Sequence, residues 1–160
     1  MKRLLLSAIL LYAAAGSEPA TAVGRPVNRL ELEIVDTRAN GTIVVAMHNR
    51  SSNSLRIWND SNSWGAGRWR VLLVHGRQVL MFHENPDRSF TRNGPGFTEI
   101  TPRQHTERKL DLNDERWLGP ANRRIESGDV VIVLYDVPLT DEATQYKVWY
   151  GVASAFRVAP

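Results

Sequence analysis

Apolar and polar residues alternate over much of this chain with a period of two, which is the pattern of half-buried β-strands. The clearest example is Leu30–Asp36, where apolar residues alternate with acidic ones. Further short runs rich in β-branched residues follow, separated by clusters of glycine, asparagine, serine and proline. The pattern predicts strands at 30–36, 42–48, 55–58, 68–74, 78–82, 97–100, 106–112, 130–135 and 146–158.

Turn signals indicate how these strands connect. Asn40-Gly41 is a strong hairpin signal between the first two strands. The run 130–135 is the most apolar part of residues 23–160 and predicts a central strand. No segment has the pattern of a long helix, and 113–126 holds at most a weak helical turn that Pro120 interrupts. The sequence therefore predicts one antiparallel β-sandwich of about seven to nine strands over residues 23–160.

Residues 1–22 have the pattern of a secretory signal peptide. A basic start at Met1–Arg3 precedes an apolar run at Leu4–Ala15 and a small-residue cleavage signal at Ala20–Ala22. The apolar run is too short to span a bilayer, and no later segment approaches that length. We therefore expect an exported bacterial protein without a membrane span, located in the periplasm or outside the cell.

Composition narrows the function classes further. The chain has no cysteine, which excludes a thiol nucleophile and leaves burial alone to hold the domain together. The formal net charge is +3, and basic and acidic residues are interspersed. This balance is not that of a nucleic-acid-binding protein.

No pattern of catalytic or metal-binding residues stands out. A Gly-x-Ser-x-Gly nucleophile elbow is absent from the sequence. The histidines, His48, His75, His83 and His105, lack the close spacing of metal motifs. The oxygen-rich segment 111–115 lacks the glycine that bends a calcium loop, so we interpret it as a polar loop. We expect neither an enzyme nor a bound cofactor or metal.

The segment Trp58–Trp69 is the most unusual part of the chain. It contains three of the 5 tryptophans, around polar and glycine residues that suit neither a strand nor a helix. Large rings beside amide, carboxylate and hydroxyl groups are typical of recognition surfaces. Strand alternation predicts that Trp69 is core and leaves Trp58 as either core or surface. Trp64 lies in the loop itself, either folded back as a plug or presented to a partner.

A second unusual segment, 84–102, combines proline and glycine with Phe90 and Phe97. Long loops in compact domains are usually functional or disordered, and proline lowers the cost of ordering them on binding. Trp64 would be the aromatic anchor of a binding surface, and Asp60 and the amides would orient the partner. The predicted partner-binding residues are Trp58, Asn59, Asp60, Asn62, Trp64, Arg68, Arg92 and Phe97.

Several short motifs carry a family resemblance. In chain order they are Asn49–Ser51, Leu55–Ile57, Leu110–Leu112, Ser127–Asp129, Tyr135, and Trp149–Gly151 with Ser154. In this pattern the chain resembles bacterial exported immunoglobulin-like modules, including proteinase-inhibitor-like and peptidase-associated domains. It departs from them at Thr101–Gln104, where arginine replaces the usual glycine, so we expect a different turn there. The resemblance implies an immunoglobulin-like sandwich. It implies no catalytic residue, because the shared pattern contains none. Its motifs say little about function, since one architecture hosts many functions.

These observations predict an exported, non-catalytic module that binds a protein partner through its loops. The resemblance makes protease inhibition the sharpest version of this hypothesis. The alternative is a carbohydrate- or cell-envelope-binding module, with exposed indoles stacked on sugar rings. Coplanar exposed rings would favour the glycan, whereas a single protruding ring in a flat polar rim would favour a protein. An enzyme would need a cleft where two carboxylates, or a histidine and a carboxylate, converge.

Overall fold

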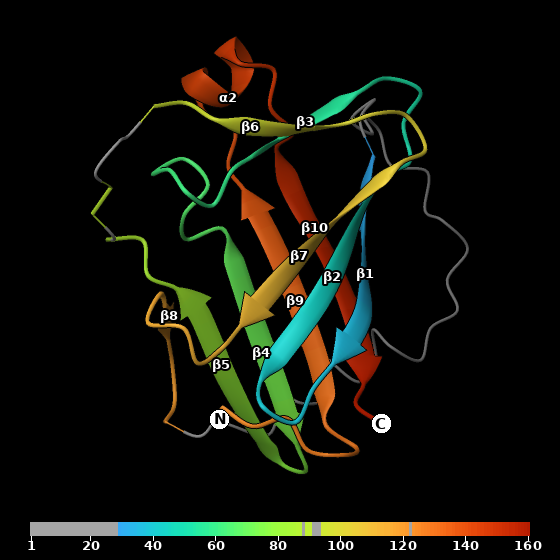
Figure 1. The fold of residues 1–160 in the computed structure, drawn as a ribbon, viewed down its shortest axis with the longest axis vertical. Coiled ribbons are helices and arrows are strands. Elements are labelled where there is room, and N and C mark those ends of the chain that lie inside the picture. The colour runs from blue at the N-terminus through green and yellow to red at the C-terminus, as the bar shows by residue number, and fades with distance from the viewer. Residues whose placement is uncertain (1–28, 88, 91–93, 122) are drawn as a thin grey trace, which may run out of the picture.

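The computed structural model describes residues 29–87, 89–90, 94–121 and 123–160, which form a sandwich of long, twisted strands (Figure 1). The predicted signal peptide, residues 1–22, lies outside these described residues. They contain a short helix, α2 (Asp141–Gln145), and no helix long and apolar enough to cross a membrane. The strands are β1 (Leu30–Thr37), β2 (Thr42–Asn49), β3 (Leu55–Trp58), β4 (Trp69–His75), β5 (Gln78–Glu84), β6 (Phe97–Ile100), β7 (His105–Asp111), β8 (Trp117–Leu118), β9 (Val130–Val137) and β10 (Gly151–Val158).

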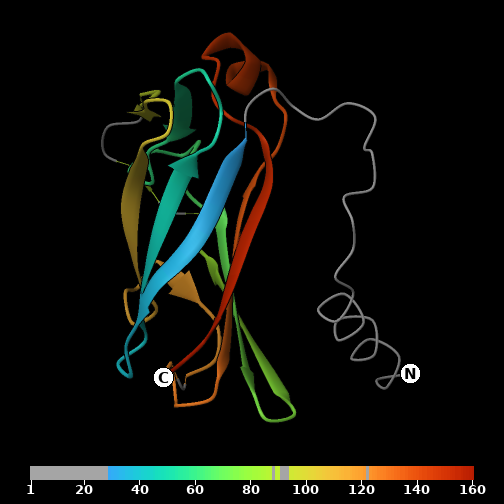
Figure 2. The same cartoon turned by 90° about the vertical axis from the view of Figure 1, so that its right-hand side faces the viewer.

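The strands form two facing sheets and a small ribbon, as the view turned by 90° shows (Figure 2). One sheet has the order β1-β2-β7, the other the order β10-β9-β4-β5-β8, and β3 pairs with β6 at one end of the sandwich. Every strand pair within these sheets runs antiparallel. The larger sheet follows the G-F-C-C′ order of immunoglobulin domains, and the smaller one follows A-B-E. The predicted antiparallel sandwich is thus confirmed, with the short β3, β6 and β8 included among its strands.

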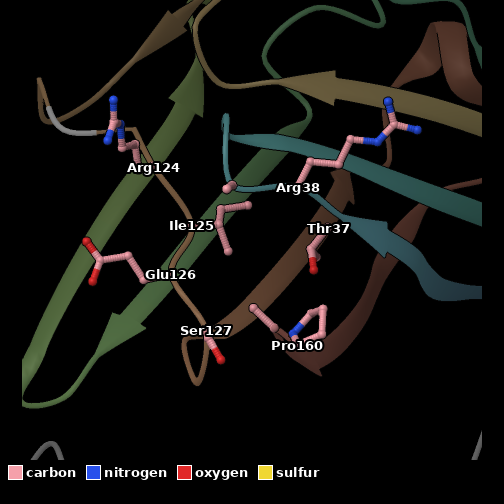
Figure 3. A pocket seen from close by; sticks show the side chains of 9 residues that line it. Thr37, Arg38, Arg124, Ile125, Glu126, Ser127 and Pro160 are labelled. Carbon is pink, nitrogen blue, oxygen red and sulfur yellow. The ribbon is translucent and has the colours of Figure 1, made fainter.

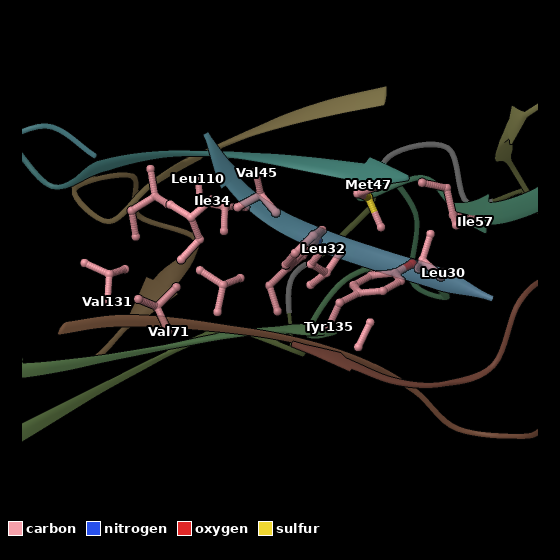
Figure 4. Close-up of a cluster of buried hydrophobic side chains, with 14 of the residues drawn as sticks. Leu30, Leu32, Ile34, Val45, Met47, Ile57, Val71, Leu110, Val131 and Tyr135 are labelled. Carbon is pink, nitrogen blue, oxygen red and sulfur yellow. The ribbon is translucent and has the colours of Figure 1, made fainter. Parts of the chain in front are cut away.

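Alternate residues of each sheet meet in one apolar core (Figure 4). Leu30, Leu32 and Ile34 of β1 point inward, while the glutamates between them are exposed. From the opposite sheet, Val71 and Tyr135 point toward them, and both are nearly inaccessible to solvent. Because one face of each sheet is buried in this way, the period-two pattern of the sequence was a sound guide to the strands.

Two tryptophans pack against Tyr135 in the core. Trp69 of β4 is 0% exposed, and its ring centroid lies 4.6 Å from that of Tyr135. Trp149 stacks on Tyr135 at 5.9 Å and is 7% exposed. The prediction that Trp69 is a core residue is confirmed, and Trp58, 2% exposed, is also buried.

The prediction of a strand over 146–158 is wrong in its first part, because the strand begins at Gly151. Thr140 caps α2 by accepting a hydrogen bond from the Ala143 N–H at 3.1 Å, and acidic residues follow it in the first turn. Cap and charge both favour a helix here. The chain then crosses the end of the sandwich, where the Trp149 N–H donates to the Arg56 carbonyl at 2.8 Å.

Two further local predictions are corrected. Residues 113–126 contribute β8, whose Trp117 is 1% exposed, rather than a loop with at most a helical turn. The turn at Thr101–Gln104 keeps the conformation that a glycine would favour, because Arg103 has φ 63°. Pro102 before it and the Gln104 N–H bond to the Thr101 carbonyl, 3.1 Å, complete the pattern of a type II turn. Arginine therefore occupies the glycine position of that turn without changing its form.

Candidate functional site

The tryptophan-rich segment forms a folded loop, residues 59–68, at the end of the sandwich that carries α2 and the β3-β6 ribbon (Figure 1). The chain makes consecutive turns between β3 and β4 rather than an extended excursion. The β3-β6 pairing brings residues 94–99 alongside this loop, since Trp58 lies opposite Phe97. Residues 146–150 join them, because the Trp149 N–H donates to the Arg56 carbonyl of β3. Three segments that are distant in sequence therefore share one surface, here called the loop end (residues 56–68, 94–99 and 146–150).

The buried amide of Asn62 holds the loop in shape. Asn62 is 3% exposed, and its Oδ1 accepts hydrogen bonds from the backbone N–H groups of Trp64 and Gly65 at 3.1 and 3.0 Å. Its Nδ2 donates to the Gly96 carbonyl at 2.9 Å. Asn59 reinforces the link, because its N–H donates to the same carbonyl at 3.0 Å. The Asn62 side chain and the Asn59 backbone thus both bind the loop to the segment before β6.

Close backbone packing explains one of the loop's glycines. A Cβ on Gly65 would lie 2.1 Å from the Asn59 carbonyl oxygen, which no side chain tolerates. Gly67 has φ +75° and donates its N–H to the carboxylate of Glu84, a residue 2% exposed, at 3.1 Å. Such contacts leave the loop little freedom to change shape.

The rings of the loop end are packed in layers. Trp58 is buried, and Trp64 stacks on it with centroids 5.9 Å apart and an interplanar angle of 26°. Tyr146 meets Trp58 edge-on at 5.9 Å. Trp64 is half-buried, so one part of its indole packs on the core and the rest faces solvent. The loop tryptophan is therefore neither a full plug nor a protruding ring.

A basic group and a second ring lie on the same surface. The guanidinium carbon of Arg56 lies 4.5 Å from the centre of the Phe97 ring, a cation–π arrangement. Arg56 also lies 3.7 Å from the carboxylate of Glu99 and donates to the Tyr146 carbonyl at 3.3 Å. Arg68 donates to the Trp64 carbonyl at 2.8 Å. The charges of this surface are therefore held in fixed positions.

The partly buried carboxylate of Asp60 connects the loop to the core. Asp60 accepts a hydrogen bond from the Trp69 indole N–H at 3.4 Å and lies 3.9 Å from the Nε of Arg108. The Tyr135 hydroxyl is buried without a hydrogen-bond partner among the described residues. Burial raises the pKa of this phenol far above its usual value, and the Asp60 carboxylate adds to the shift. Tyr135 therefore stays neutral at physiological pH and acts as core.

The structure places most of the predicted binding residues together, but with different exposure. Trp58 and Asn62 are buried, so their contribution is to hold the loop rather than to offer surface. The half-buried members are Asn59, Asp60, Trp64, Arg68 and Phe97. Arg92 lies outside the described residues. Sequence reasoning missed Arg56 and Tyr146, and no local signal could have joined them to the loop, because β3-β6 pairing and the turn after α2 bring them there.

Two of the histidines lie side by side in the smaller sheet, and the other two lie in the larger sheet. His48 bonds to Glu33 at 2.9 Å, and its ring centroid lies 5.2 Å from that of His105 on the neighbouring β7. In the larger sheet, His75 bonds to Asp129 at 2.6 Å. Within the part of the chain that the structure describes, no three histidine or carboxylate groups are placed to hold a metal ion. In the segment 111–115, carboxylates accept bonds from neighbouring backbone N–H groups, as expected of a polar loop.

A pocket of about 450 Å³ lies at the opposite end of the sandwich, next to the C-terminal residue (Figure 3). Its lining includes Thr37, Arg38 and Glu126. Arg38 pairs with Asp36 at 2.9 Å, and Glu126 lies 3.8 Å from the His75 ring, so both charges are engaged outside the pocket. A third charged residue, Arg124, also lines the pocket.

The fold and the site together define an all-β sandwich with a rigid, partly aromatic loop at one end. No protein-family model matches the chain, and no curated protein matches it significantly. Among solved structures, the archaellum periplasmic stator protein complex FlaF and FlaG from Sulfolobus acidocaldarius is similar, with 12% sequence identity and a TM-score of 0.38. The match covers 90% of this chain and 99% of that chain. Similarity at this level carries no conclusion about what this chain does.

Proposed function

We propose that the protein is an exported, non-catalytic module that binds a protein partner through its loop end. The observation that carries the proposal is a loop fixed in one shape by the buried amide of Asn62, with Trp64, Arg68 and Phe97 still partly open to solvent. Nothing in this proposal assigns a reaction or a cofactor to the chain. Export to the periplasm or beyond rests on the sequence of residues 1–22.

Pre-organisation is what makes the loop end suited to binding. A loop that is already ordered loses little conformational freedom when a partner binds, and more of the contact energy then appears as affinity. Aromatic rings and arginines are the residue types that most often dominate protein interfaces. At the loop end they are surrounded by exposed small or polar residues such as Ser61, Ser63 and Gly94.

The geometry of the loop end favours a protein partner over a glycan and gives no support to protease inhibition. Stacking on successive sugars would need two exposed coplanar rings, but Trp58, the ring parallel to Trp64, is 2% exposed. Substrate-like protease inhibition would need an extended segment able to pair as a strand, whereas residues 59–67 are folded into turns. We therefore propose neither protease inhibition nor glycan binding.

Affinity capture from an envelope extract tests the proposal. The purified chain and its Trp64→Ala variant serve as baits, and Ser61→Arg adds bulk to the exposed tip without touching the core. Both substitutions should abolish recovery of the partner that the unaltered chain captures. Val35→Ala, a truncation at an exposed apolar site on β1, 41% exposed, is the matched control and should retain it.

Folding must be separated from binding in this test, because Trp64 packs partly on the core. Far-ultraviolet circular dichroism and thermal unfolding of each variant provide that check. If folded Trp64→Ala and Ser61→Arg variants both recover the partner as well as the unaltered chain does, the loop end is not the binding surface.

A further inference from the structure

The outer face of the five-stranded sheet is apolar, although an antiparallel sandwich usually turns polar residues to water. Residues paired directly across strands point to the same face, so the register identifies the rows of this face. The row nearest the β4-β5 turn is Val158, Val130, Val74 and Val79. The next row is Phe156, Ile132, Leu72 and Met81. Four neighbouring strands therefore present two complete apolar rows, here called the apolar rows.

The apolar rows are open to solvent. Phe156 is 73% exposed, Val158 58%, Met81 55% and Val79 47%. The remaining members are half-buried by their neighbours in the sheet, as residues of internal strands are. Val152, which lies on the same face of β10 outside the two rows, is also exposed, at 67%. Contiguous apolar surface of this kind marks an interaction site on a soluble protein, unlike single scattered apolar residues.

Polar groups border the apolar rows at both ends. Beyond the second row lie Arg70 and Asp136, which pair with each other at 3.0 Å on the same face. Beyond the first row lies the exposed turn 75–78 between β4 and β5. An apolar centre with a polar rim is the anatomy of a protein interface. Because Arg70 and Asp136 neutralise each other, this face carries little net charge to repel an identical one.

We propose that the apolar rows are the interface of a homodimer, with the same face of a second copy as the occupant. Two twisted sheets can pack face to face about 10 Å apart, and a two-fold axis brings the same patch of both copies together. Four strands about 4.8 Å apart and about 27 Å long give the whole outer face a flat footprint of roughly 500 Å², of which the two apolar rows make up about half. The accessible area over protruding side chains exceeds the flat footprint, so an interface of the standard size of roughly 800 Å² per partner would take in the polar rim as well as the apolar rows.

Face-to-face packing is favoured over pairing through the strand edge. β10 is the outermost strand of its sheet, but its edge lies against β1 of the other sheet. There the guanidinium of Arg157 donates to the carbonyl oxygens of Ile34 and Val35. A side chain that bridges the two sheets in this way obstructs addition of a further strand. The exposed face is therefore the available surface, and it does not include the loop end of the proposed function.

Sedimentation velocity across a range of protein concentrations tests the proposal. The unaltered chain should sediment as a dimer at micromolar concentration. The double variant Phe156→Asp/Met81→Asp places charges in the apolar rows and should raise the dissociation constant by at least about 100-fold. Both side chains are exposed, so the variant should fold, which circular dichroism and thermal unfolding verify. Leu139→Asp, at an apolar site 64% exposed and outside the sheet, should remain dimeric.

Two results would overturn the homodimer. One is an unaltered chain that remains monomeric at about 100 µM, well above the dissociation constants of standard-size interfaces. If that monomer floats with phosphatidylcholine vesicles, the face belongs to a lipid surface instead. The other is a folded double variant that dimerises as tightly as the unaltered chain. Neither result bears on partner capture through Trp64, so the two proposals fail separately.

Discussion

Replacing Asn62 by alanine tests whether one buried amide holds the loop end. The substitution removes the acceptor of two backbone N–H groups, those of Trp64 and Gly65, and the donor to the Gly96 carbonyl. That carbonyl keeps the Asn59 N–H as a partner, so the main cost is the two unpaired N–H groups. At about 1–3 kcal/mol for each buried group, and less for the half-buried Trp64, the expected loss of unfolding free energy is about 2–4 kcal/mol.

Urea unfolding followed by tryptophan fluorescence measures that loss, with the slope of the transition as a check that unfolding remains two-state. Near-ultraviolet circular dichroism should change as well, since the stacked pair Trp58 and Trp64 depends on the loop. The control is Ser61→Ala, at the exposed neighbouring position, which should change stability by less than about 0.5 kcal/mol. If Asn62→Ala costs less than about 1 kcal/mol, the amide does not organise the loop and the reasoning is refuted.

Two smaller predictions concern a turn and a pH dependence. Arg103→Gly should raise the free energy of unfolding in urea by about 0.5–1 kcal/mol. Glycine removes the energetic cost of the left-handed conformation, and this gain exceeds the entropy that glycine adds to the unfolded chain. A destabilised variant would contradict this prediction. The hydrogen bond and charge of Asp129, with the charge of Glu126, raise the pKa of His75 above its ordinary 6.5. The resulting stabilisation is complete below about pH 6.5 and disappears as the pH rises through the raised pKa. His75→Gln should therefore lower the melting temperature at about pH 6 and not at about pH 9, and equal losses at both would refute this sign.

The sequence predicted the strands well for a physical reason. Burial of one face of each sheet forces alternation, and alternation is visible in a single strand such as 30–36. Long-range contacts are not visible in this way. The sequence around Asn62 suggests a solvated loop residue, but the side chain is buried. Its amide donates a hydrogen bond to the Gly96 carbonyl, 34 positions away in the sequence. Trp117 lies among polar residues, yet β8 pairs with β5 and turns its indole into the core.

In the segment 146–150, by contrast, a local pattern predicted a strand that the structure does not contain. Its rings and β-branched residue have strand character, but Thr140 and the acidic turn after it start a helix just before them. The chain then returns over the end of the sandwich and enters β10 at Gly151, which has φ +133°. A local propensity for strand was thus overridden by a cap and by packing on Arg56, neither of which periodicity registers.

The apolar pattern of β9 carries information that the strand prediction left unused. A strand buried on one face needs apolar residues in one phase, but Val130–Leu134 is apolar in both. Continuous apolar runs are typical of strands covered on both faces, and the structure covers only one. A homodimer would cover the second face of β9 and leave the loop ends accessible, because Trp69 lies three residues along β4 from Leu72 of the nearer apolar row, about 10 Å at 3.4 Å per residue. Such a dimer would present two loop ends, so a partner with repeated epitopes would be held with an avidity beyond the affinity of either loop alone.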